Sequence, residues 1–314
     1  MDLGERIREA RLAAGLTQDA LAHAVNTDRA AVARIEAGER RVGALELFAL
    51  ADAVGVRPAV LVTAPPFGDD RPTLEEDPDA GARSAARLRF LVATHARDAV
   101  HLFDGGYLPA GSGVAPPSTS GGRDLADLLA EAGLYLLVAP GVHGGAAVRV
   151  GEGFGVAVVG GADGPERRRL VAARALGDFL RAGEAFAAQF LLPAGDVRLA
   201  FEDEGEDRSR LVRLAVAHRV PWSLAVGVAQ GLGLVKDDAA RRLTSTPPTL
   251  GERIEVAGAH PPEDLRPGTT PVVWERAVLA AWRDGAVTAP RAVELLHGAL
   301  DEADLPDPEG PPAR

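Results

Sequence analysis

Histidine is the residue type in this chain best suited to chemistry, because imidazole binds metals and transfers protons near neutral pH. A helical zinc hydrolase site needs two histidines four residues apart with a glutamate between them, and no pair here has that spacing. Each histidine is therefore interpreted as a packed or surface residue, and the sequence predicts no metal ligand. The seven histidines are His23, His95, His101, His143, His218, His260 and His297.

Other catalytic patterns are also missing from the sequence. The chain has no cysteine, which excludes disulfides, cysteine-ligated zinc, iron–sulfur clusters and thiol catalysis. Neither the Gly-x-Ser-x-Gly nor the Ser-x-x-Lys motif occurs. The glycine-rich segments 151–155 and 160–164 have neither dinucleotide-binding spacing nor a Walker lysine, and both are predicted to be turns. The sequence thus predicts no catalytic residue and no cofactor.

Residues 17–41 suggest a different kind of chemistry, the recognition of a nucleic acid by helix ends and arginines. Thr17 and Asp28 are helix N-cap residue types, and each precedes a run of helix formers. The second helix, at about 28–37, begins with Arg29, a side-chain type that reads guanine, followed by small alanines that permit close approach. The apolar residues expected to pack inward are Val25, Val32 and Ile35.

The runs 3–18 and 21–38 resemble the Cro/C1 (XRE) helix-turn-helix family. This resemblance implies a five-helix DNA-binding domain over residues 1–62, whose second motif helix lies in the major groove. The Gln18 amide is expected to point at a phosphate or base edge, and the turn after the second helix to touch backbone phosphate. The predicted DNA-binding residues are Gln18, Thr27, Asp28, Arg29, Ala30, Arg34, Arg40 and Arg41.

The net charge of residues 1–62 indicates how this domain would bind DNA. Residues 1–62 contain eight arginines and nine acidic residues, and the whole chain has a net charge of −11, which argues against a general polyanion binder. A single neutral helix-turn-helix makes few phosphate contacts. We therefore expect a homodimer that binds a palindromic double-stranded DNA operator.

A second pattern covers residues 165–193, where an arginine-rich helix start runs into Ala173–Asp178 and later into Phe186–Ala188. It resembles the active-site helix of ImmA/IrrE-type metallopeptidases, and the similarity covers roughly 123–235. In that family the frame reads Ala-His-Glu-Leu-Gly-His, whereas here Arg174, Ala175 and Asp178 replace two zinc ligands and the base. The resemblance implies a zincin-like scaffold that has lost its metal and its catalysis.

The same resemblance implies a cleft in which an arginine side chain replaces the zinc ion. Arg174 places a permanent cation where zinc would lie, and Glu184 is near the place of the family's third ligand. We predict a candidate effector pocket of Arg174, Asp178 and Glu184 that accepts an anionic small molecule or a protein effector. The alternative is that Arg174 pairs with Asp178 or Glu184 and that the domain only dimerises.

Apolar periodicity indicates the elements that must position these residues. Three short runs rich in β-branched and aromatic residues indicate a small antiparallel sheet at 134–138, 146–150 and 154–159. Residues 245–272 are expected to be irregular. Helices are predicted at 83–103, 123–132, 165–182, 184–191, 208–218, 222–233 and 273–302.

The predicted fold class is mainly α with a small β-sheet. A five-helix Cro/C1-type domain precedes an α+β zincin-like pseudo-peptidase domain and C-terminal helices. We place the helix-turn-helix domain at 1–62, a proline- and acid-rich linker at 63–81, the pseudo-metallopeptidase domain at 82–244, a C-terminal helical region at 245–304 and a tail at 305–314.

No apolar run approaches the about 20 residues of a membrane span, and the N-terminus lacks signal-peptide features, so a cytoplasmic protein without membrane contacts is expected. The sequence predicts a dimeric transcriptional regulator, expected to be a repressor, with a catalytically dead sensing or dimerisation domain. One alternative is an ImmA/IrrE-like peptidase with a relocated site that cleaves a repressor. Another is an antitoxin or lysogeny-type interaction protein.

Overall fold

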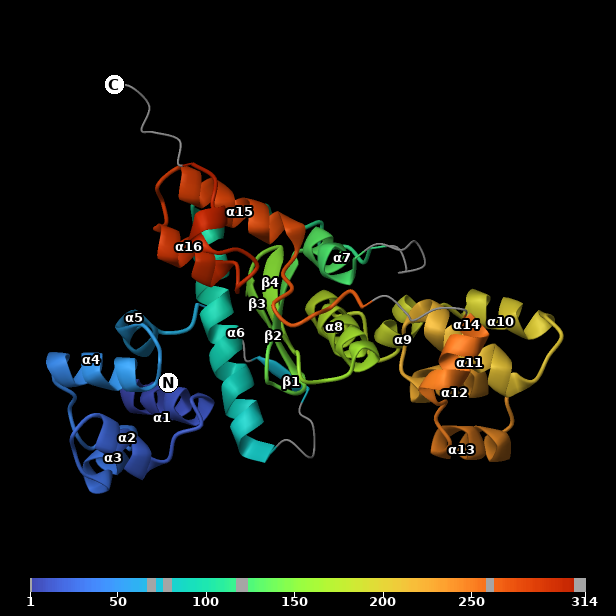
Figure 1. Cartoon of the computed structure of the whole chain (residues 1–314), viewed down its shortest axis with the longest axis horizontal. Helices are drawn as coiled ribbons and strands as arrows, with labels where there is room; N and C mark the ends of the chain where they lie inside the picture. Colours follow the sequence, from blue (N-terminus) through green and yellow to red (C-terminus); the bar gives the residue numbers. More distant parts are fainter. Residues whose placement is uncertain (1, 67–71, 76–80, 117–123, 258–262, 308–314) are drawn as a thin grey trace.

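The structure, a computed structural model, describes residues 2–66, 72–75, 81–116, 124–257 and 263–307. Its first five helices form a small N-terminal domain (Figure 1). They are α1 (Leu3–Ala13), α2 (Gln18–Ala24), α3 (Arg29–Glu36), α4 (Ala44–Ala53) and α5 (Pro58–Val62). Their apolar faces enclose a core that includes Ile7, Val32 and Ile35, each at most 2% exposed. The expected five-helix architecture and the inward packing of Val32 and Ile35 are confirmed.

Glycine permits the tight crossing of α1 and α3 in this domain. A Cβ atom on Gly4 would lie 2.3 Å from the carbonyl oxygen of Ile35 and 2.9 Å from that of Glu36. Any side chain at position 4 would therefore push α1 away from the C-terminal end of α3.

The centre of the molecule is a four-stranded sheet in the order β1-β3-β4-β2. The strands are β1 (Thr73–Glu75), β2 (Leu134–Ala139), β3 (Gly145–Gly151) and β4 (Phe154–Gly160). β3 pairs antiparallel with both β4 and β1, but β2 pairs parallel with β4. The three expected strands are present, whereas the expectation of an antiparallel sheet is wrong, because the sheet is mixed.

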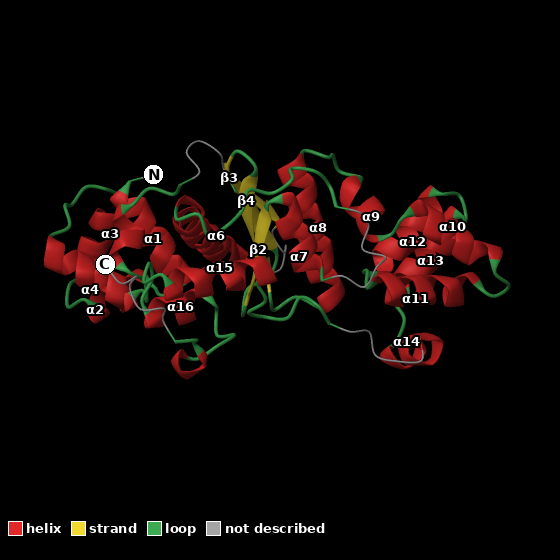
Figure 2. Cartoon of the chain, turned by 90° about the horizontal axis from the view of Figure 1, so that it is seen from above, coloured by secondary structure: helices red, strands yellow, loops and turns green. Residues whose placement is uncertain are grey.

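Helices cover both faces of this sheet (Figure 2). Alternate residues of β2 enter two separate cores, since Leu134 and Leu136 face one side, and Tyr135 and Leu137 the other. The first side packs on α7 (Leu125–Ala132) and α8 (Pro165–Leu180). The second side packs on α6 (Gly81–Asp104), α15 (Val272–Arg283) and α16 (Ala289–Leu295). Burial on both faces explains why the strands read as apolar runs without polar alternation.

A helical lobe continues the core beyond α8 (Figure 1). Its members are α9 (Phe186–Leu191), α10 (Ala194–Glu202), α11 (Asp207–His218), α12 (Trp222–Gly231), α13 (Asp237–Ser245) and α14 (Leu250–Ala257). In the part of the chain that the structure describes, no single helix is long and apolar enough to cross a membrane, although α11 and α12, bent by 119°, pass that test as a pair.

The chain after α9 differs from the sequence prediction. The segment 245–272, expected to be irregular, contains α14, which packs against α11, and the helices α10 and α13 were not predicted. The helix predicted at 273–302 is instead α15, α16 and the 3-10 turn η1 (Glu302–Asp304). α14 thus packs with the helical lobe, whereas α15 and α16 pack against α6 and the sheet.

The arginine-rich start of α8 has a structural role. Arg168 and Arg169 are 4% and 1% exposed. Arg168 pairs with Glu263 at 2.5 Å and donates to the Leu265 carbonyl, and Arg169 pairs with Asp264. These buried pairs hold the 263–265 segment against α8. They explain the arginines without any ligand.

Candidate nucleic-acid interface and the cleft between the sheet and α8

The two helix-turn-helix helices begin at the residues that the sequence indicates. The Thr17 hydroxyl accepts the backbone N–H of Ala20 at 3.0 Å, and the Asp28 carboxylate accepts that of Ala31 at 2.7 Å. Both caps are therefore confirmed. Between the helices, Asn26 adopts a left-handed conformation with φ of 55°, which turns the chain so that α3 crosses α2.

α3 and the two residues before it present predicted DNA-binding residues to solvent. Asp28, Arg29, Ala30 and Arg34 are exposed, and Thr27 is half-buried. Arg29 is 67% exposed and makes a loose ion pair with Asp19 at 3.9 Å, an interaction too weak to hold it away from a base. This face of α3 is free to enter a groove.

Two of the predicted contacts are already engaged within the protein. The Gln18 amide donates to Glu36 Oε2 at 2.9 Å instead of pointing outward. Arg40 pairs with Glu46 at 2.7 Å, while Arg41 in the same turn is exposed. A phosphate contact by Arg40 would have to compete with this ion pair.

A buried ion pair between α1 and the end of α3 holds α3 in place. It was not predicted from the sequence. Arg11 Nε and Nη2 donate to the two oxygens of Glu36 at 2.6 and 3.0 Å, and the two side chains are 8% and 4% exposed. Arg11 Nη1 also donates to the Leu16 carbonyl at 2.8 Å. The pair ties α1, the α1–α2 turn and the end of α3 together.

The N-terminal domain rests on α6, the longest helix of the second domain. α1 packs along α6, and Phe90 joins the apolar core of the N-terminal domain. Arg97 donates to the Thr63 carbonyl at 2.7 Å, and Arg57 lies 3.7 Å from Asp98. These contacts connect the five-helix N-terminal domain to the sheet domain.

The segment predicted to be a linker contains β1, which lies at the edge of the sheet beside α8. Arg174 pairs with Glu75 of β1. The alternative that Arg174 pairs with Asp178 or Glu184 is therefore wrong. Burial raises the pKa of Asp178, and the nearby charge of Arg174 partly offsets this rise.

The predicted effector pocket is partly assembled. Thr73, Glu75, Arg174 and Asp178 line a narrow gap between β1, β3 and α8. The third predicted member, Glu184, lies in the exposed turn after α8. Glu75 takes its place, because strand pairing brings a residue 99 positions away to Arg174.

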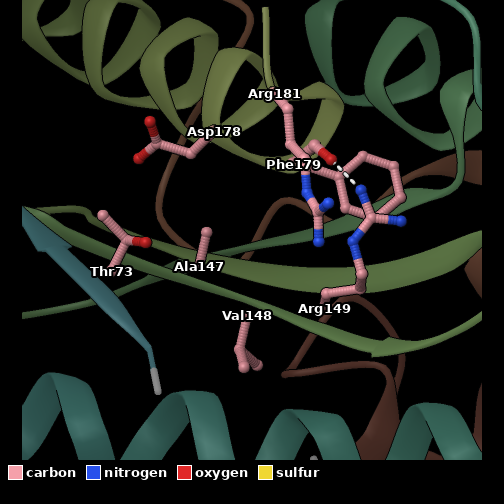
Figure 3. A pocket seen from close by; sticks show the side chains of 7 residues that line it. All are labelled: Thr73, Ala147, Val148, Arg149, Asp178, Phe179 and Arg181. Atoms are coloured by element: carbon pink, nitrogen blue, oxygen red, sulfur yellow. Dashed lines mark hydrogen bonds between the residues drawn. The ribbon is translucent and has the colours of Figure 1, made fainter. Parts of the chain in front are cut away.

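A larger cavity of about 150 Å³ continues from this gap along β3 (Figure 3). Arg149 donates to the Phe179 carbonyl and lies 4.6 Å from the centre of the Phe179 ring. Arg181 ends α8 in a left-handed conformation and lines the same cavity. In Figure 3 the side chains of Arg149 and Arg181 extend toward one another across it.

The histidines are dispersed among the described residues, which exclude His260. Among those residues no three His, Asp or Glu side chains are placed to hold one metal ion. His95 is 1% exposed, and its ring lies 4.4 Å from that of Trp274 and 6.0 Å from that of His297. Burial lowers the pKa of His95 to about 3 and that of His297 to about 4.

Comparison with known proteins bears on the N-terminal domain alone. A helix-turn-helix family model matches residues 7–61. No curated protein and no solved structure matches the chain. The N-terminal domain is therefore an XRE-type helix-turn-helix domain, and this supports a DNA-binding regulator.

Proposed function

We propose that this protein is a cytoplasmic, sequence-specific transcriptional repressor that binds a palindromic operator as a homodimer. The observation that carries the proposal is the exposed face of α3 in a matched helix-turn-helix domain, where Arg29 in the first turn and Arg34 in the last turn are both exposed. Leu45 and Phe48 on α4, which are 87% and 61% exposed, offer apolar area to a second copy.

The operator is obtained by selecting bound sites from random double-stranded DNA and by footprinting the protein's own promoter region. Replacing Arg29 with alanine is expected to cost about 1–3 kcal/mol of operator affinity and to relax specificity at one base pair. Arg40→Ala is expected to weaken binding to all sequences alike and to reduce the salt dependence, because it would remove a phosphate contact. Affinities are measured by fluorescence anisotropy over a range of salt concentrations.

Arg241→Ala is the matched control, because Arg241 is an exposed arginine on α13, away from the N-terminal domain. It is expected to leave operator affinity unchanged. Unaltered affinity in the Arg29→Ala/Arg34→Ala double variant would show that α3 does not read the DNA.

We further propose that the second domain is a pseudo-peptidase of the ImmA/IrrE type that senses an effector or dimerises. The order of a helix, a small sheet and the helix carrying Arg174 supports this proposal, as does the replacement of the zinc-binding frame. The competing enzyme hypothesis requires a relocated site that cleaves a repressor. The antitoxin or lysogeny-type alternative shares the DNA-binding domain and differs in its genetic neighbours.

Protein purified without chelators is expected to carry far less than one zinc ion per chain, as measured by atomic emission. The physical reason is that Arg174 and Ala175 offer no metal ligand and Asp178 alone is a poor zinc site. Stoichiometric zinc that EDTA removes, together with cleavage of a repressor-type substrate, would instead support the enzyme hypothesis.

A further inference from the structure

The strand β1 is a weakly held occupant of the cleft. It contributes three residues, which pair with Ala147, Ala146 and Gly145 of β3. Its charged contact, Glu75 with Arg174, involves an arginine side chain that is 51% exposed. Glu75 Oε2 is buried and has no hydrogen-bond partner among the described residues. A short ladder and a partly solvated ion pair contribute little stability, so β1 can be exchanged for another strand.

The edge of β3 continues beyond the part that β1 covers. β3 extends to Gly151, whereas β1 pairs only as far as Ala147. In this register residue 72 would face Val148, but residue 72 is proline, which has no N–H to donate. Within the described ranges, no strand pairs with the outer edge of 148–151. An open strand edge of this kind accepts extended peptides by strand addition.

The charges along this edge define the chemistry of a suitable peptide. Arg149 and Arg181 line the cavity beside the open edge, and Arg174 lies at the end that β1 covers. The one acidic side chain of α8 that lines both spaces is Asp178. Arg149, Arg174 and Arg181 together carry more positive charge than Asp178 neutralises, and this favours an acidic ligand.

We infer that the groove between β3 and α8 binds an extended acidic peptide of a partner protein, and that β1 is a built-in competitor which this peptide displaces. One peptide carboxylate takes the place of Glu75 at Arg174, and the peptide backbone pairs with β3 from Gly145 to Gly151. This inference deepens the proposed function, because it specifies the effector of the second domain as a peptide segment.

The test uses the full-length protein and a labelled synthetic peptide that copies residues 70–77 with Pro72→Val, so that pairing can extend past Ala147. Binding is measured by fluorescence anisotropy, and backbone protection by hydrogen exchange. We expect the peptide to bind and to slow exchange of amides in Val148–Gly151. Free glutamate at the same concentration is expected not to compete.

Variants on the two sides of the ion pair have opposite expected effects. With residues 73–75 already replaced by Gly-Ser-Gly, so that no competing Glu75 is present, Arg174→Gln is expected to weaken peptide binding about tenfold, because the charge-assisted contact with the peptide is lost. Glu75→Gln is expected to tighten it about two- to fivefold, because the internal competitor is weakened. Replacing residues 73–75 with Gly-Ser-Gly should tighten binding further. Glu202→Gln is the matched control for an exposed acid at the end of α10, outside the groove, and should have no effect.

Equal peptide affinity in wild-type protein and Glu75→Gln, or in the Gly-Ser-Gly variant with and without Arg174→Gln, would overturn the inference, as would competition by free glutamate without protection of β3. Operator binding is measured separately on the same preparations. Operator binding without peptide binding would contradict only this inference. Peptide binding without any operator would contradict the proposed function and leave the groove intact.

Discussion

Replacing Arg11 with methionine is expected to lower the free energy of unfolding of the N-terminal domain by about 3–5 kcal/mol. The substitution removes the bidentate partner of Glu36, whose side chain is 4% exposed, and leaves that carboxylate buried with the Gln18 amide as its remaining side-chain partner. The Leu16 carbonyl also loses a donor. The loss is expected to appear as faster hydrogen exchange of the α1 and α3 amides in the full-length protein.

Two further variants distinguish the effect of leaving a buried charge unpaired from the general effect of losing an arginine on stability. Arg29→Met, which breaks the loose and exposed pair with Asp19, is expected to change stability by less than about 1 kcal/mol. The double variant Arg11→Met/Glu36→Met is expected to recover much of the loss, because no unpaired charge remains buried. If Arg11→Met costs no more than Arg29→Met, the pair does not support α3.

Lowering the pH from 6.5 to 4 is expected to destabilise the second domain through His95 and His297. Burial lowers the pKa of both groups in the folded state, to about 3 and about 4. In this pH range the unfolded chain binds a proton at each histidine and the folded chain does not, so acid favours unfolding. Each histidine contributes a slope of about 1.4 kcal/mol per pH unit.

Asp98, which lies on α6 as His95 does, opposes the acid destabilisation caused by the two histidines. Burial raises its pKa to about 6, while Arg291 and Arg57 act in the opposite direction. The folded state therefore holds a proton on Asp98 between the unfolded and folded pKa values, which stabilises it as the pH falls through 6. For these three groups taken together, two histidines against one aspartate contribute a slope of about 1.4 kcal/mol per pH unit, with acid destabilising.

Urea unfolding at several pH values measures this slope. His95→Gln is expected to reduce it by about 1.4 kcal/mol per pH unit between pH 6 and 4. His101→Gln is the matched control, because His101 lies on α6 as well but is exposed. A slope that is the same in His95→Gln and wild-type protein would show that His95 does not govern the acid response.

Local sequence was sufficient to predict the helix caps and two core residues of the N-terminal domain. Thr17 and Asp28 form caps with backbone groups three residues away, and Val32 and Ile35 share one face of a short helix. Such features depend on helical spacing, so they can be read without knowing the fold. The three main strands and the helices around them were predictable for the same reason.

Only the tertiary structure decided which distant residues meet. Arg174 pairs with Glu75, Arg11 with Glu36, and Arg169 with Asp264, at separations of 99, 25 and 95 residues. The parallel pairing of β2 with β4 and the packing of α14 on α11 are of the same kind. Strand register and helix packing set these contacts, and both depend on the whole core. The type of a residue and the apolar periodicity around it do not indicate which distant residue it contacts. The local sequence therefore determined the helix-turn-helix, whereas the three-dimensional packing determined that β1, from the segment predicted to be a linker, lies beside α8 and pairs with Arg174.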